Sequence, residues 1–466
     1  MYKMKYLNIK TGVLALSLAL TSVSCSRDFT ETVFNESEVA SSWKSVEQMH
    51  SFVLGSLIDM RSQYYYGKDF SIYAEVRSDH MVSNGRSGYY TSVAGYEMTS
   101  ADAYATNTYK QIYKVIAKAN NIVNFDINSL DNAAASKAEA TYYVGQAYAL
   151  RAQGFFDLLR LYGQKYTGGN EGIVLPLKFD PLNKQGRSSV ADTEKQIEAD
   201  FDAALAKMNA SKGFDNLDNK FELSINAVKA LAARYYLYKN NYVKVQALVN
   251  DIITGNSNRY SVIDKDALVS SWATSGTARN SIFELAFGEV AQPGAASYAY
   301  IMNSRGYANT VVSDAGMASY AKNDARLKLI QNVGGSNFLN NKFPGLTGAV
   351  SIRIVRYEEV ILDGAEAEFN LGNTAKALEY LNMILVNRGL DKATSITMED
   401  IMAERSKELI GEGFRMWDLL RWGKEIPRKT GAKKDKELIA FPIPRLETDL
   451  SGTLVKGNPG YDNYRP

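Results

Sequence analysis

The chain has 466 residues, with 53 Lys and Arg against 51 Asp and Glu and a formal net charge of +2. A nearly neutral chain has no bulk electrostatic attraction for nucleic acid or for anionic lipid surfaces. With two histidines and one cysteine, the sequence excludes cysteine-rich zinc sites, iron–sulfur clusters and internal disulfide bonds. Its 45% hydrophobic and 22% charged content is typical of a folded globular protein.

Residues 1–24 are predicted to be a signal peptide. A start rich in lysine precedes the apolar run 13–23, which has about the length of a signal-peptide hydrophobic region and is too short to span a bilayer. Cleavage before Cys25 would leave the only thiol of the chain at the mature N-terminus, so we expect Cys25 to be lipidated. Ser22 stands where a bacterial lipobox usually has an aliphatic residue, and the alternative is an unmodified thiol in a polar tether.

The body of the chain is predicted to be mostly α-helical. Only nine prolines occur, and residues 142–162 and 193–208 place apolar side chains at helical spacing. Residues 226–254 and 357–389 resemble each other, because each has an alanine- and aromatic-rich helix, a short polar break and a second helix. Such pairs are typical of tetratricopeptide-like helical hairpins, here degenerate and separated by insertions.

Two segments differ from this helical pattern. Residues 62–109 are rich in tyrosine, serine, glycine and asparagine, and residues 256–350 combine aromatic residues with many glycines. We expect both to form long loop excursions on the helical scaffold, where binding residues often lie.

The strongest motif lies near the C-terminus. Residues 404–423 read ERSKELIGEGFRMWDLLRWG. This closely resembles the E-R-x-x-E-L-x-x-E-G-x-R-x-x-D-L-x-R-W-G signature of the SusD/RagB-like nutrient-binding lipoproteins of Bacteroidetes. Further stretches that resemble motifs of this family are residues 77–79, 149–163, 356–367, 441–444 and 458–461.

The resemblance implies a SusD-like, mostly helical fold, with a signal peptide at 1–24, an N-terminal region at 25–255 and a C-terminal region at 256–466. It also implies a lipid-anchored protein on the outer surface of the outer membrane. Such a protein captures oligosaccharides and delivers them to a SusC-like TonB-dependent barrel. Two alternatives remain open, namely peptide import of the RagB type and a tetratricopeptide scaffold for protein–protein contacts.

The candidate binding residues come mainly from the two tyrosine-rich segments. A tyrosine ring offers a flat apolar face for a sugar ring, and amide, carboxylate and guanidinium groups can pair with sugar hydroxyls. Asp79 matches a family motif and is expected to bind ligand, face the barrel or cap a helix. The candidates are Tyr64, Tyr65, Tyr66, Asp79, Asn84, Arg86, Tyr89, Tyr90, Trp272, Tyr298 and Tyr300.

The signature itself is expected to be structural. Its apolar residues share one helical stripe, which places Trp417 in the core. Glu404, Glu408, Arg415 and Asp418 are predicted to be buried or semi-buried ion-pair partners that fix helix packing. A serine-x-x-lysine at residues 41–44 and the Lys-Thr-Gly at 429–431 match two motifs of β-lactamases. In those enzymes the Lys-Thr-Gly lies on a strand that lines the site, whereas here it lies in a basic turn without a strand pattern. We therefore expect no catalytic residue, no cofactor and no metal site.

Overall fold

The structure is a computed structural model that describes residues 43–130, 134–180 and 182–465. The predicted signal peptide and Cys25 lie outside the described residues. The elements below belong to the unit that begins at Lys44. None of the helices in the described ranges is long and apolar enough to cross a membrane.

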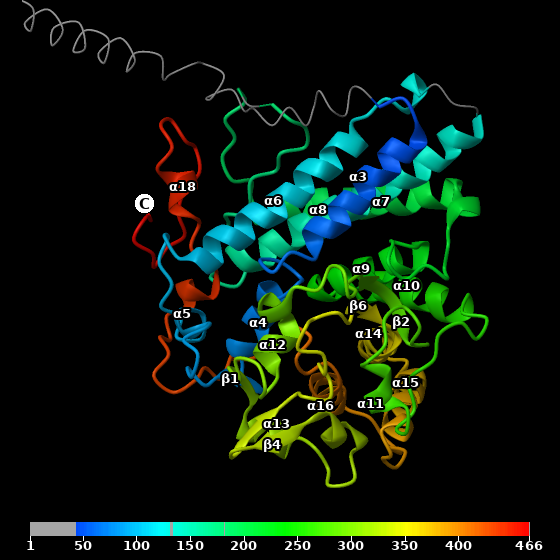
Figure 1. Cartoon of the computed structure of the whole chain (residues 1–466), viewed down its shortest axis with the longest axis vertical. Helices are drawn as coiled ribbons and strands as arrows, with labels where there is room; N and C mark the ends of the chain where they lie inside the picture. Colours follow the sequence, from blue (N-terminus) through cyan, green and yellow to red (C-terminus); the bar gives the residue numbers. More distant parts are fainter. Residues whose placement is uncertain (1–42, 131–133, 181, 466) are drawn as a thin grey trace, which may run out of the picture. The chain divides into compact units, whose positions relative to one another are not determined.

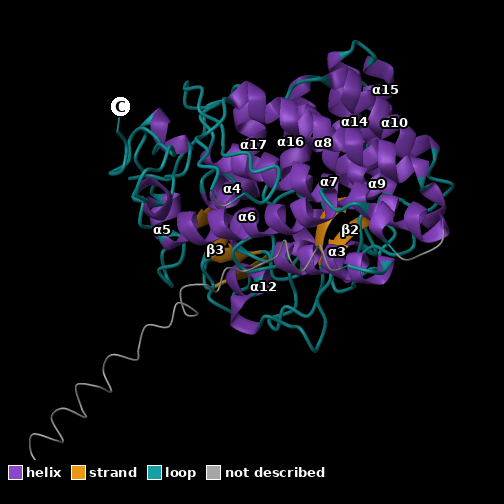
Figure 2. Ribbon diagram, turned by 90° about the horizontal axis from the view of Figure 1, so that it is seen from above, coloured by secondary structure: helices purple, strands orange, loops and turns teal. Residues whose placement is uncertain are grey.

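Helices dominate the regular structure, which confirms the predicted fold class, and the few strands lie among loops (Figures 1 and 2). The long helices α3, α6, α7 and α8 pack side by side. The α-helices are α3 (Val46–Met60), α4 (Asp69–Val76), α5 (Thr91–Ala94), α6 (Ala103–Val123), α7 (Ala134–Tyr162), α8 (Val190–Ala210), α9 (Ile225–Tyr238), α10 (Tyr242–Thr254), α11 (Leu268–Ser271), α12 (Tyr298–Met302), α13 (Asp314–Ala318), α14 (Tyr357–Asn370), α15 (Thr374–Asn387), α16 (Met398–Glu408), α17 (Arg415–Arg421) and α18 (Arg445–Thr448).

The two predicted helical hairpins are present. The first, α9 and α10, turns at Asn240 with φ of 54°, and the second, α14 and α15, turns at Gly372 with φ of 84°. Gly364 of α14 allows the hairpins to pack closely. A Cβ atom there would lie 2.9 Å from Val249 of α10 and 2.9 Å from Tyr380 of α15. The close approach therefore needs a residue without a side chain.

The strands connect segments that are far apart in the chain. β1 (Met81–Ser83), β3 (Thr310–Val312), β5 (Ser336–Phe338) and β4 (Gln331–Val333) form an antiparallel sheet in that order. β2 (Ser281–Leu285) pairs antiparallel with β6 (Ile352–Arg356). Because β1 pairs with β3, the loop that follows β1 lies beside the loop that precedes β3.

Residues 62–109 are not the single long excursion that the sequence predicts. They contain α4, β1, α5 and the first turns of α6. The tyrosine-rich composition is misleading because buried tyrosines can satisfy their hydroxyl groups inside the protein. Tyr73, for example, is fully buried and its hydroxyl lies 2.9 Å from Oγ1 of Thr108. Residues 256–350 fit the prediction better, as short helices and strands joined by loops.

The signature segment holds the second half of the fold together through buried charges. Arg405 of α16 contacts Asp363 of α14 at 2.5 Å and Asp418 of α17 at 2.9 Å, and all three side chains are at most 5% exposed. One guanidinium therefore joins three helices. Trp417 is also buried, as the sequence predicts.

The other predicted ion pairs of the signature are confirmed as well. Glu404 pairs with Arg326 at 2.7 Å, and Glu408 pairs with Arg388 at 2.6 Å. Arg415 pairs with Asp79 at 2.7 Å. The motif thus encodes helix packing through charge pairing.

We expect Arg405→Met to lower the free energy of unfolding by about 3–5 kcal/mol, because it leaves two buried carboxylates without their shared partner. Chemical denaturation measures this loss. The matched control is Lys376→Met, which breaks an exposed pair with Glu379 on α15 and should cost less than about 1 kcal/mol. Equal losses of stability in the two variants would contradict a structural role for the buried contacts of Arg405 with Asp363 and Asp418.

Candidate functional site

The predicted site residues fall into different environments. Tyr65 and Tyr90 have no exposed surface, and their hydroxyls donate to the carboxylates of Asp157 and Asp69. Their rings offer no accessible face to a ligand. Tyr64 is 37% exposed and belongs to neither of the two aromatic groups described next.

Tyr89 and Tyr300 lie together with a third ring that the sequence does not single out, Tyr307. The ring centroids of Tyr89 and Tyr307 are 4.6 Å apart, and those of Tyr300 and Tyr307 are 4.8 Å apart. All three side chains are half-buried. Hydrogen bonding to Tyr307, followed by burial, raises the pKa of the Tyr89 phenol, so it is neutral at physiological pH. We call these three rings the tyrosine surface.

Two hydrogen-bonded loops hold the tyrosine surface. In the loop after β1, the backbone N–H of Asn84 donates to the carbonyl of Asn309 at 2.9 Å, and its side-chain amide donates to the carbonyl of Ala308 at 2.7 Å. Ser87 donates from Oγ to Oδ1 of Asn309 at 2.7 Å. Arg86 is exposed in the same loop. These contacts fix polar groups beside the rings.

Backbone conformation also orients the rings. Tyr90, directly after Tyr89, has φ of 58°, and Ala308, directly after Tyr307, has φ of 49°. A side-chain-bearing residue in the left-handed region costs of order 1 kcal/mol or more, and such strain is concentrated at functional sites. Both strained residues are themselves buried, so the core holds the backbone that presents each neighbouring ring.

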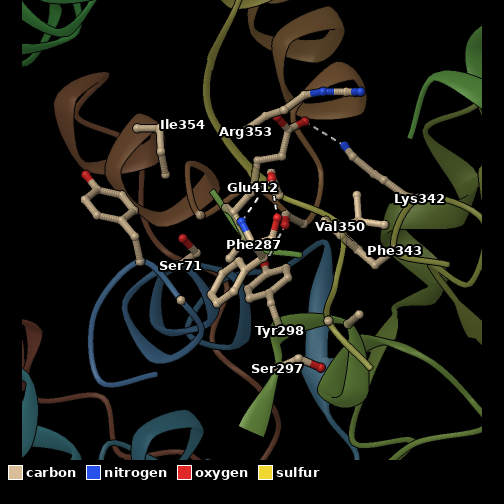
Figure 3. Close-up of a pocket in the computed structure, with 18 of the residues that line it drawn as sticks. Ser71, Phe287, Ser297, Tyr298, Lys342, Phe343, Val350, Arg353, Ile354 and Glu412 are labelled. Carbon is tan, nitrogen blue, oxygen red and sulfur yellow. Dashed lines mark hydrogen bonds and ion pairs between the residues drawn. The ribbon is translucent and has the colours of Figure 1, made fainter. Parts of the chain in front are cut away.

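The remaining predicted aromatic residues line a pocket, part of which Figure 3 shows with Tyr298 labelled. Tyr66, Trp272 and Tyr298 are buried and line a space of about 930 Å³, a volume that includes open solvent. Tyr298 packs edge-on against Phe343 with centroids 4.9 Å apart. Residues two apart point to different faces of a helix, which explains why Tyr298 faces the pocket and Tyr300 the tyrosine surface. We call this space the ring-lined pocket.

Asp79 has a structural partner. Both of its carboxylate oxygens accept hydrogen bonds from Arg415 at 2.7 Å. Burial disfavours the charged carboxylate, but the hydrogen bonds and charge of Arg415 outweigh it and lower the pKa of Asp79. The adjacent His80 is 7% exposed, and its carbonyl accepts a hydrogen bond from the backbone N–H of Ser313 at 2.9 Å. This pair of residues therefore helps to fix β1 against the segment after β3.

Comparisons with known proteins show the family to which this chain belongs. A family model described as "SusD family" matches residues 163–437, more than half of the chain. The chain belongs to the SusD family. A second model, described as "Starch-binding associating with outer membrane", matches residues 34–237.

Individual relatives of this SusD-family chain span most of its length. A SusD-like protein of Bacteroides ovatus is 21% identical over 73% of this chain and 69% of its own. A solved SusD superfamily protein of Bacteroides vulgatus has a TM-score of 0.81 and 27% identity, covering 90% of this chain and all of its own. The surface glycan-binding protein A of Bacteroides fluxus has a TM-score of 0.70 and 21% identity, and the match covers 88% of this chain and 99% of that protein. At that identity, this last likeness concerns the fold.

His80 should make the stability of this SusD-family chain sensitive to acid. Burial, and then the charge of Arg415, lower the pKa of His80 to about 4 from an ordinary 6.5. Between pH 6.5 and 4 the unfolded chain takes up a proton at His80 that the folded chain does not. The free energy of unfolding therefore falls as pH falls through this window, by about 3 kcal/mol in all.

Denaturation of the wild-type chain and of His80→Asn across pH 4–7.5 measures this contribution. The stability difference between the two should change by about 3 kcal/mol over that range. His50, whose pKa is raised by its hydrogen bond to Glu222, contributes equally to both chains and cancels. A difference that does not vary with pH would show that His80 titrates normally.

Proposed function

We propose that this chain captures oligosaccharides on the tyrosine surface and delivers them to a SusC-like TonB-dependent transporter of the outer membrane. The observation that supports this most directly is the set of three half-buried rings held by two hydrogen-bonded loops. Membership of the SusD family supports carbohydrate binding. The chain is proposed to act as a binding protein and not as an enzyme.

The chemistry of the tyrosine surface suits a sugar chain. The rings of Tyr89, Tyr300 and Tyr307 offer apolar faces for the C–H faces of successive sugar rings. Asn84 and Arg86 place amide and guanidinium groups on the same loop as Tyr89, where they can pair with hydroxyl groups. Because the loops are already hydrogen-bonded together, little ordering is required when a ligand binds.

We expect Tyr307→Ala to weaken oligosaccharide binding by about 10–30-fold, because it removes the central ring, and loss of a central aromatic contact costs about 2 kcal/mol. Calorimetric titration with plant and host oligosaccharides measures the loss. Tyr89→Ala should behave similarly, whereas Tyr89→Phe keeps the ring face and should weaken binding by no more than about threefold.

The matched control for these variants is Tyr464→Ala, which removes a ring that is 41% exposed in the C-terminal segment. It should leave the affinity unchanged. A peptide digest titrated in parallel tests the RagB-type alternative, and binding of peptides alone would overturn the glycan assignment. An oligosaccharide that binds Tyr307→Ala as tightly as the wild type would place the ligand elsewhere.

Membrane attachment is proposed to depend on lipidation of Cys25, which lies outside the described residues. We expect Cys25→Ala to move the protein from the membrane fraction to the soluble fraction, because acyl chains supply the membrane affinity. Cell fractionation followed by immunoblotting measures the distribution. A variant that stays fully in the membrane fraction would refute this anchor.

A further inference from the structure

The tyrosine surface is bordered by three chain segments whose charged residues are all positive. Residues 84–95 follow β1 and contain Tyr89, residues 303–309 precede β3 and contain Tyr307, and residues 428–434 follow α17. None of the three segments contains Asp or Glu. Their six cationic residues are Arg86, Arg305, Arg428, Lys429, Lys433 and Lys434. Because the whole chain has 53 Lys and Arg against 51 Asp and Glu, this excess of positive charge is local.

Hydrogen bonds bring the three segments together. The contacts of residues 84 and 87 with residues 308 and 309 join the first two. Nζ of Lys429 donates to the carbonyl of Ser83 at 3.0 Å, and Oγ of Ser83 donates to the carbonyl of Tyr89 at 3.1 Å. The backbone N–H of Lys433 donates to the carbonyl of Gly95 at 3.0 Å, and Figure 1 shows this orange-red segment beside α5. The basic segment is therefore fixed next to the loop that carries Tyr89.

Arg86 and Arg305 are the cations nearest in sequence to the rings. Arg86 lies three residues before Tyr89 and Arg305 two residues before Tyr307, and the centroids of these two rings are 4.6 Å apart. Both arginines are exposed, so a ligand can reach their guanidinium groups. The side chain of Arg305 makes one long hydrogen bond, to the carbonyl of Pro344 at 3.4 Å, and a guanidinium has five N–H donors. The guanidinium of Arg86 has no partner among the described residues.

The protein does not neutralise these charges. None of the six cations forms an ion pair with an Asp or Glu in the part of the chain that the structure describes, and the side chains of Arg428 and Lys429 donate to backbone carbonyls. The carboxylate of Asp69 is buried and lies 3.5 Å from Nζ of Lys68, which is itself 5.6 Å from the ring centroid of Tyr89. Uncompensated charges of one sign attract ligands of the opposite sign.

We propose that the tyrosine surface binds an acidic oligosaccharide, one that carries carboxylate or sulfate groups on its sugar rings. The sugar rings lie on the tyrosines, and the anionic groups pair with Arg86 and Arg305. The planar fork of a guanidinium can donate to two oxygens of one such group. The lysines of residues 428–434 attract the charged chain from its surroundings. This inference rests on the proposed function, because it takes the tyrosine surface as the oligosaccharide site.

The test compares acidic oligosaccharides with neutral forms of the same sugar chains. Tetrasaccharides of galacturonate, glucuronate and mannuronate are titrated beside their methyl esters, and a sulfated galactan tetrasaccharide beside its desulfated form. Calorimetry with the purified full chain should show at least one acid binding about tenfold more tightly than its neutral form, since a hydrogen bond to a charged group contributes about 1.5–3 kcal/mol. The four pairs also distinguish a carboxylate from a sulfate.

Raising the salt concentration from about 0.05 M to about 0.5 M should reduce this preference, because salt screens exposed charges. The affinity of the neutral forms should change little. A preference for the acid that does not depend on salt would contradict the role of the exposed cations.

Two variants place the anionic group. Arg86→Gln and Arg305→Gln each remove a charge and keep a polar side chain, and each should weaken binding of the acid about threefold to fivefold while leaving its neutral form within about twofold. The matched control is Arg279→Gln, which removes an exposed guanidinium of the turn before β2, outside the three segments. It should leave both affinities unchanged. Melting temperatures show that the variants are folded.

The outcomes separate this inference from the proposed function. If a neutral form binds as tightly as its acid and Tyr307→Ala still weakens it, the inference fails and the proposed function stands. If an acid binds Tyr307→Ala as tightly as the wild type, or if no oligosaccharide binds, both fail. A single-stranded thymidine oligonucleotide that binds more tightly than every oligosaccharide would overturn the sugar assignment in favour of nucleic acid.

Discussion

The carboxylate of Glu408 is the contact on which the second half of the fold depends. It accepts hydrogen bonds from Arg356 at 2.7 Å and from Arg388 at 2.6 Å, and lies 3.1 Å from Arg326. The three arginines come from the end of β6, the end of α15 and the segment before β4. Burial opposes the charge of Glu408, but these guanidiniums outweigh it and hold its pKa well below the ordinary range. Because several arginines share one buried carboxylate, none of these elements can shift alone.

Both the tyrosine surface and the ring-lined pocket adjoin this frame of buried ion pairs. Arg356, fixed by Glu408, also pairs with Glu412, which in turn pairs with Lys342 in the wall of the ring-lined pocket. The tyrosine surface rests on the pairing of β1 with β3, next to which Arg415 of the same signature segment binds Asp79. A motif rich in ion pairs therefore positions segments that border the tyrosine surface and the ring-lined pocket, without contributing a ring to the tyrosine surface.

Periodicity and local spacing predicted the helical hairpins and the ion pairs of the signature, because both are written in short stretches of sequence. Periodicity and spacing could not show which tyrosines are fully buried and which keep an accessible ring. Tyr89 and Tyr90 are neighbours of the same type, yet one is half-buried in a ring cluster and the other is fully buried on Asp69. The difference comes from the left-handed conformation of Tyr90 and from tertiary contacts. Tyr307 was not among the predicted binding residues for a similar reason, since its partner Tyr89 is brought beside it only by the pairing of β1 with β3.

The short helix α12 lies between the tyrosine surface and the ring-lined pocket. Its start is fixed by Ser297, whose hydroxyl accepts a hydrogen bond from the N–H of Tyr300 at 3.1 Å. The hydroxyl of Tyr298 donates a hydrogen bond to the carbonyl of Gly411 at 2.5 Å, which holds the Tyr298 ring on the side of the pocket. Tyr300 is turned to the opposite side, towards Tyr307. Asn84, Arg86 and Ser87 lie on the loop of Tyr89, whereas Lys342 and Arg353 contribute to the lining of the ring-lined pocket. The same helix therefore contributes one ring to the tyrosine surface and another to the ring-lined pocket.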